Sequence, residues 1–180
     1  MNYFRKNHQH KILRKIIINK TIMILVINLV FAGNLFAQNK VEISDINILN
    51  NSKWQGKLMY IDYSSGKETY LKTEMQLEIK GKKIFMSTQY NNEPNANSKG
   101  VIKLKKDGTY FGKEKVIEKT QKENGILKIV TMFEGQDNNK KATIYKTYLF
   151  NEKMYSVIKE VQFNGSNEKF IRNKYSYTRI

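Results

Sequence analysis

Apolar and polar residues alternate from Trp54 to the end of the chain, and short groups of turn-forming residues interrupt the alternation. The pattern is clearest between residues 71 and 79, where every second residue is apolar or threonine and the residues between are charged or carry an amide. Successive side chains of a β-strand point to opposite faces. Each such segment therefore predicts a strand with one face in a core and the other in water.

Nine segments show this alternation, and turns rather than helical stretches join them. Asn-Gly and Asp-Gly pairs at several joints supply the positive φ angles of tight hairpins, which indicates antiparallel neighbours. A meander of such strands removes its exposed edges by closing on itself. The sequence therefore predicts an all-β fold, an antiparallel up-and-down β-barrel of 8 to 10 strands, since residues 100–121 can hold one, two or three of them. The candidate strands are 53–63, 68–80, 83–90, 100–105, 109–121, 125–134, 141–150, 153–163 and 168–179.

The first 37 residues have the three parts of a secretory signal peptide. Residues 1–20 carry basic side chains and no acid, residues 21–31 are mostly apolar, and a stretch with small residues ends at Ala37. We predict a signal helix that is cleaved after Ala37. The alternative is a membrane anchor, but the apolar run falls short of the roughly 20 residues that span a bilayer.

This interpretation divides the chain into a signal peptide (1–37), a lead-in segment (38–52) and a barrel (53–180). It predicts export to the periplasm or the extracellular space, with no stable membrane insertion after cleavage. An outer-membrane barrel also alternates, but its outward face is apolar. Here the polar faces of nearly all candidate strands are charged. The sequence gives no indication of the oligomeric state.

The residue types after Ala37 exclude several kinds of chemistry. The chain has no Cys, and its only two His, His8 and His10, lie in the predicted signal. An imidazole base, a thiolate, a disulfide or a zinc site with N and S ligands therefore cannot form in residues 38–180. We expect neither a metal nor a cofactor.

Residues 38–180 carry 26 basic and 16 acidic residues, a net charge of +10. Only Arg172 and Arg179 are arginines, and the lysines are scattered along the strands. Recognition of phosphates and base edges relies on the planar guanidinium group. We therefore expect a solvated lysine surface and no nucleic-acid partner.

The segment around Trp54, with Gly56 two residues later, resembles the first strand of lipocalin-like proteins of the calycin superfamily, although the usual order there is Gly-x-Trp. In that superfamily the Trp packs against an Arg or Lys from the last strand and closes one end of the barrel. Trp54 and Arg179 match these two positions. The resemblance implies an up-and-down barrel around a ligand cavity, with Trp54 and Arg179 as the structural closure.

Candidate ligand-binding residues follow from the strand pattern. Tyr60 and Asp62 end the first candidate strand and could orient a polar ligand group at the mouth of a cavity. For Asp62, acceptance of backbone N–H bonds in the turn at Ser64 and Ser65 is the favoured alternative. Strand parity suggests five further residues for the cavity wall: Met75, Leu77, Thr131, Phe133 and Tyr145.

Three functions remain from the sequence. The leading hypothesis is an exported, non-enzymatic barrel that binds a small, mostly apolar ligand, because the chain has no catalytic motif. The second is an envelope interaction or structural module whose barrel is filled by side chains. The third is an enzyme that uses tyrosine or carboxylate groups, among them Asp62. Cavity volume distinguishes the first two.

Overall fold

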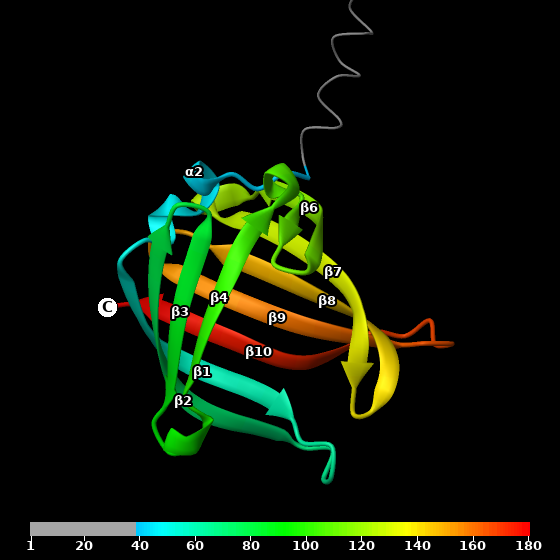
Figure 1. Ribbon diagram of the computed structural model, residues 1–180. Coiled ribbons are helices and arrows are strands. Elements are labelled where there is room, and N and C mark those ends of the chain that lie inside the picture. Colours follow the sequence, from blue (N-terminus) through cyan, green and yellow to red (C-terminus); the bar gives the residue numbers. More distant parts are fainter. Residues whose placement is uncertain (1–38) are drawn as a thin grey trace, which may run out of the picture. The chain divides into compact units, whose positions relative to one another are not determined.

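Ten antiparallel strands close into a single ring in the computed structural model, which describes residues 39–180 (Figure 1). Each strand pairs with its neighbours in sequence, and β1 pairs with β10 to close the barrel. The predicted all-β up-and-down barrel is confirmed, with ten strands. They are β1 Ser52–Ile61, β2 Glu68–Lys80, β3 Lys83–Tyr90, β4 Ser98–Lys105, β5 Tyr110–Phe111, β6 Glu114–Gln121, β7 Leu127–Asp137, β8 Lys140–Phe150, β9 Met154–Phe163 and β10 Phe170–Arg179.

The tenth strand arises because the segment 109–121, predicted as one strand, contains two. Gly112 has a φ of 63°, a left-handed conformation that turns the chain between β5 and β6. β5 is two residues long and pairs with β4 only at Leu104 and Lys105. The rest of β4 therefore has β3 as its one strand neighbour.

The lead-in segment belongs to the same core as the barrel. It forms a short helix, α2 (Ile43–Ile46), and a 3₁₀ turn, η1 (Asn47–Leu49), and Figure 1 shows it at one end of the barrel. Val41, Ile46 and Leu49 are buried among barrel side chains. The backbone N–H of Val41 donates to the carbonyl of Gly108 at 3.0 Å, which ties the segment to the loop after β4.

Three more 3₁₀ turns lie in loops: η2 Pro94–Ala96, η3 Lys106–Gly108 and η4 Glu123–Gly125. Within residues 39–180, no helix is long and apolar enough to cross a membrane. The predicted signal peptide and its cleavage after Ala37 lie outside the described residues.

Candidate functional site

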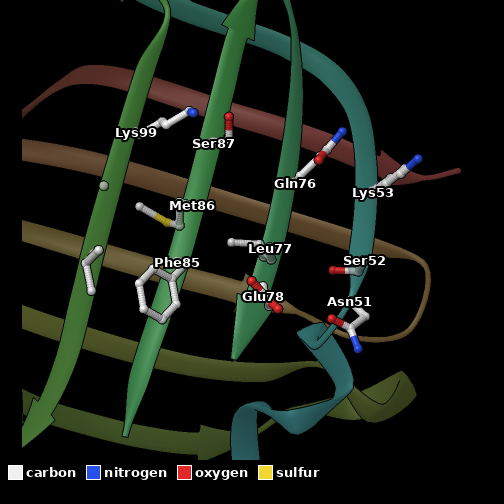
Figure 2. A pocket seen from close by; sticks show the side chains of 12 residues that line it. Asn51, Ser52, Lys53, Gln76, Leu77, Glu78, Phe85, Met86, Ser87 and Lys99 are labelled. Atoms are coloured by element: carbon white, nitrogen blue, oxygen red, sulfur yellow. The ribbon is translucent and has the colours of Figure 1, made fainter. Parts of the chain in front are cut away.

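Residues 39–180 form two hollows that are large enough to hold a ligand. The larger, about 630 Å³, lies on the outer face of β1 to β4, and Figure 2 shows its lining from Lys53 across to Lys99. The smaller, about 260 Å³, is inside the barrel, with a lining drawn from β2, β3, β4, β8, β9 and β10. The interior cavity is the candidate ligand site, because apolar walls and convergent polar groups meet there.

Tyrosine rings make up much of the cavity wall. The five are Tyr90, Tyr148, Tyr155, Tyr175 and Tyr177. The hydroxyls of Tyr90 on β3 and Tyr175 on β10 are hydrogen-bonded to each other at 2.8 Å, across the two strands β1 and β2 that separate them in the ring. The rings of Tyr175 and Tyr177 stack with planes 8° apart and centroids 6.0 Å apart. The wall thus offers flat aromatic surfaces together with phenol groups.

Burial keeps these phenols protonated. It raises the pKa of Tyr177 to about 12, and it raises the pKa values of Tyr148, Tyr155 and Tyr175 above the ordinary tyrosine value. For Tyr175 the hydrogen bond with Tyr90 adds to the effect. At neutral pH the phenols of Tyr148, Tyr155, Tyr175 and Tyr177 therefore keep their protons, and that of Tyr148 donates to Glu114.

Two buried hydroxyls near the cavity have no hydrogen-bond partner within residues 39–180. They are the hydroxyl of Tyr177, which lines the cavity, and Oγ1 of Thr73, whose side chain is 1% exposed. A buried hydroxyl without a partner costs about 1–3 kcal/mol. The two hydroxyls are neighbours, because Thr73 acts on the pKa of Tyr177.

Charged side chains also face the interior, and one group of them centres on Glu114 of β6. Its carboxylate, 7% exposed, accepts hydrogen bonds from Thr131 Oγ1 at 2.7 Å and from the Tyr148 hydroxyl at 3.0 Å. It also forms an ion pair with Lys146 of β8, a residue of the cavity wall. Side chains of β6, β7 and β8 form this network, which holds the Lys146 ammonium group at the cavity.

A second charged group centres on Asp137 at the end of β7. Lys159 Nζ, from the cavity wall, lies 2.7 Å from Asp137 Oδ1, and Arg172 Nε lies 3.5 Å from Oδ2. The Arg172 guanidinium also donates to the carbonyl of Ile61 and lies 3.9 Å from the centroid of the Tyr63 ring. This group sits toward the end of the barrel away from the lead-in segment.

The two groups together contain three cations (Lys146, Lys159, Arg172) and two carboxylates (Glu114, Asp137). Arg172 also acts on the Asp62 carboxylate, so three carboxylates face the three cations. Lys146 and Lys159 line the cavity, where their ammonium groups can donate to an anionic or strongly accepting group of a ligand.

The seven predicted ligand residues are only partly brought together. Met75 lines the cavity. Leu77 is buried in the hydrophobic core and lines the larger hollow, and Thr131 is buried as a donor to Glu114. Phe133 is half-buried, with Lys113 Nζ and Lys146 Nζ at 4.9 Å and 5.5 Å from its ring centroid. A role in ligand binding stays a prediction for each of these residues.

Tyr145 requires a correction of strand parity. On β8 the even-numbered Ile144, Lys146 and Tyr148 face the interior, so Tyr145 lies on the outer face. There Lys169 Nζ lies 3.5 Å from the centroid of the Tyr145 ring, and the Tyr145 hydroxyl donates to Gln162 Oε1 at 3.4 Å. The parity was misassigned because an inward lysine breaks the apolar alternation of this strand.

Tyr60 and Asp62 lie at the end of β1 without joining the cavity wall. Tyr60 is the register partner of Asn173, which does line the cavity. Asp62 Oδ1 accepts hydrogen bonds from the Ser64 hydroxyl at 2.5 Å and from the backbone N–H groups of Ser64 and Ser65 at 2.7 Å and 3.2 Å. These bonds hold the pKa of Asp62 below its usual range. Asp62 therefore has the role that the sequence favoured, as an acceptor of backbone N–H bonds in the turn.

Sequence reasoning missed the tyrosines, Lys146 and Lys159 as cavity residues. For Lys159 a signal was visible, because it interrupts an otherwise apolar face formed by Tyr155, Val157, Val161 and Phe163. A charge on an apolar strand face is paired when buried, and Asp137 is that partner. Among the described residues no group of three or more His, Cys, Asp or Glu is placed to hold a metal ion.

A comparison with protein-family models gives no match, and no curated protein matches. Among solved structures, one similar chain is the S-type phycobiliprotein lyase CPES of Guillardia theta, with a TM-score of 0.48 and 12% identity. The match covers 79% of this chain and 94% of the lyase. At this level of similarity the likeness assigns neither a substrate nor an activity to the chain.

The likeness does correct one expectation. The lack of catalytic motifs led to the prediction of a non-enzymatic barrel, whereas the similar barrel is described as a lyase. The prediction of a non-enzymatic barrel is therefore withdrawn.

Proposed function

We propose that this protein is an exported, lipocalin-like barrel that binds one small, mostly apolar ligand in its interior. The observation that carries the proposal is the cavity of about 260 Å³, lined by five tyrosine rings and by Met75 and Met86. Typical ligand pockets begin at roughly 300 Å³, so the ligand is small. The alternative, a filled barrel serving as an interaction module, is less well supported because side chains leave this volume unfilled.

The polar part of the wall defines the ligand further. Lys146 and Lys159 place ammonium groups beside the aromatic surface, each held there by a carboxylate from another strand. Buried phenols supply neutral donors. The arrangement fits a flat or elongated apolar molecule with one carboxylate or similar acceptor group.

Native mass spectrometry on protein purified gently from its own host tests the proposal directly. We expect a 1:1 complex that releases a discrete small molecule on extraction with organic solvent. A bare protein in that experiment, combined with failure to bind the probes described next, would contradict a ligand-binding function.

A cavity-filling variant tests the location of the site. Val157 lines the cavity, and Val157→Phe would occupy part of its volume. We expect isothermal titration with 2-naphthoate to show binding to the wild type and at least a tenfold loss in the variant. Ile171→Phe, at a side chain 42% exposed, is the matched control. Neutral 2-naphthylmethanol should bind more weakly than naphthoate if the cations recognise the anionic group.

Export is tested separately. If the signal is cleaved after Ala37, the intact mass of protein recovered outside the cytoplasm corresponds to a chain beginning at Gln38. Recovery of the full-length chain from the cytoplasm alone would contradict export and leave the ligand proposal untouched.

A further inference from the structure

The edge of β4 is open along most of its length. β5 pairs with β4 only at Leu104 and Lys105, so among the described residues, 39–180, the five residues 98–102 have β3 as their single strand partner. Their pairing with β3 has no register shift, so this edge carries no bulge. Proteins commonly blunt such edges with bulges, prolines, very short strands or charged side chains, lysine above all. The stretch 98–102 has Lys99 but none of the other devices, so its backbone groups stay open to a strand that can pair with a lysine.

Four backbone groups point outward from this edge. Leu104 N–H donates to Lys82 O at 2.9 Å on the β3 side, so even-numbered residues of β4 bond toward β3. Odd-numbered residues point the other way, and Lys103 O accordingly accepts from Gly112 N at 2.8 Å. The N–H and C=O groups of Lys99 and Val101 have no backbone partner among residues 39–180.

The outer face beside this edge combines apolar surface with unneutralised positive charge. Val101 is 56% exposed, and its register partner Phe85 continues the apolar surface onto β3. Both line the hollow of about 630 Å³, and Figure 2 shows Phe85 between the strands that carry Lys99 and Glu78.

Lysines flank the apolar surface. Lys99 and Lys103 lie on either side of Val101 on the same face of β4. Neither has a carboxylate within 4.0 Å in the part of the chain that the structure describes. Glu78, the acidic residue of the hollow, is already paired with Lys80 at 2.8 Å.

We propose that residues 98–102 of β4 bind an extended acidic segment of a partner protein by strand addition. The partner strand forms hydrogen bonds with the outward backbone groups of Lys99 and Val101. Every second side chain of the partner strand points to the outer face, where Lys99 and Val101 lie. On that face an acidic residue lies opposite Lys99, and an apolar residue two positions along lies opposite Val101. The added strand extends the rows of side chains on the outer face, apart from the interior cavity.

Charge decides between this partner and a second copy of the same chain. A second copy would bring its own Lys99 and Lys103 to the edge, and residues 38–180 carry a net charge of +10. Like charges opposite each other destabilise strand pairing. The same lysines that repel a copy attract an acidic strand, so the edge is selective.

The peptide Thr-Glu-Thr-Val-Thr-Glu-Thr tests the proposal, because its pattern is the same in either strand direction. Nitrogen-15 NMR of the purified protein should show shifts confined to residues 98–102 and their neighbours, and slower hydrogen exchange of the Lys99 and Val101 amides. The peptide Thr-Thr-Glu-Val-Glu-Thr-Thr has the same composition with the alternation broken. It should bind about tenfold more weakly.

Two variants separate strand addition from general attraction between charges. Lys99→Glu should weaken binding about tenfold, whereas Lys57→Glu, the same charge change on the outer face of β1, should change it less than twofold. Val101→Pro removes an outward donor at an edge position that tolerates proline. It should abolish the slowed exchange at Lys99 while the amides of the other strands remain protected.

Three results would overturn the proposal. Equal losses in the Lys57→Glu and Lys99→Glu variants would indicate nonspecific attraction. Protection of the Lys99 and Val101 amides in the protein alone, rising with its concentration, would indicate self-association. Shifts of the same amides with phosphatidylglycerol vesicles and none with the peptide would indicate a lipid surface.

Discussion

The guanidinium of Arg179 lies 5.4 Å from the centre of the Trp54 ring, and the two residues are register partners in the β1–β10 ladder that closes the barrel. Trp54 is fully buried, and its indole N–H donates to Ser52 Oγ at 2.7 Å. Ser52 Oγ in turn donates to Leu49 O at 2.5 Å. The ring of Trp54, a residue of the first strand, thus contacts the last strand directly and the lead-in segment through Ser52.

Replacement of Arg179 tests the cation–π contact. Arg179→Met keeps much of the aliphatic stem and removes the charge, so we expect a loss of about 0.5–1 kcal/mol in the free energy of unfolding. Arg179→Lys should retain part of the stabilisation, because lysine keeps the positive charge. Urea denaturation followed by the fluorescence of Trp54, the single tryptophan, measures both. Equal stability of Arg179→Met and the wild type would show that the contact contributes nothing.

Gly56 occupies a position on β1 where no side chain fits. A Cβ there would lie 2.0 Å from Ser176 O and 2.8 Å from the Tyr177 Cα, both backbone atoms of β10. We expect Gly56→Ala to cost about 1–3 kcal/mol or more, because β10 must move to admit the methyl group. Gly100→Ala is the control, since its Cβ would meet only Met86 Cε at 3.8 Å. Thermal unfolding of the two variants should differ clearly, and similar midpoints would contradict the prediction.

The barrel was predictable from the sequence because its hairpins are local. Turn residues marked the strand ends, and the segment 83–90 agrees with β3 at both ends. The split of 109–121 was left open as one of the alternatives for residues 100–121, because the turn at Gly112 has no Asn-Gly or Asp-Gly signal. A strand as short as β5 leaves too few residues for alternation to be visible.

The cavity was less predictable because its lining departs from the rule that charges face water. Lys146 and Lys159 reach the interior only because Glu114 and Asp137 face them from other strands. Such pairing across strands is a property of the folded register and is not written in any local pattern. Assigning strand faces by hydrophobicity alone therefore placed Tyr145 on the wrong side.

Removal of the Glu114 carboxylate should be strongly destabilising. Glu114→Ala leaves Lys146 without its ion-pair partner and removes the acceptor of the Thr131 and Tyr148 hydroxyls. Breaking a buried pair of this kind costs about 3–5 kcal/mol. Glu134→Ala, which removes an exposed acceptor of one Thr143 bond, should cost less than about 1 kcal/mol. Urea denaturation of the two variants gives the comparison, and equal losses would contradict the role of Glu114.

Stability should fall at alkaline pH. Burial raises the pKa of Tyr177 from its ordinary value of 10.0 to about 12, and those of Tyr148, Tyr155 and Tyr175 are also raised. The unfolded chain releases these protons at lower pH than the folded chain, so ionisation favours unfolding. The stabilisation is complete below pH 10 and is lost as the pH rises toward 12, at about 1.4 kcal/mol per pH unit for one tyrosine.

Tyrosinate absorbance and circular dichroism during the same alkaline titration measure this effect. The buried tyrosines should ionise together with the loss of strand signal. Ionisation of all tyrosines near pH 10 with the barrel intact would contradict the raised pKa values. A Tyr177→Phe variant should shift the transition to higher pH, because one proton fewer is coupled to unfolding.

The ladder between β1 and β10 also sets a limit on how the chain can fold. Its pair Trp54 and Arg179 joins residues 125 positions apart (179 − 54), while the other ladders form between strands that follow one another in sequence. The nine hairpin ladders can assemble progressively at low loop-closure cost, but the ring closes only when the final strand arrives. Synthesis from the N-terminus delivers that strand last. Until then Trp54 has no partner from β10, so we expect ring closure to be the last step of barrel formation.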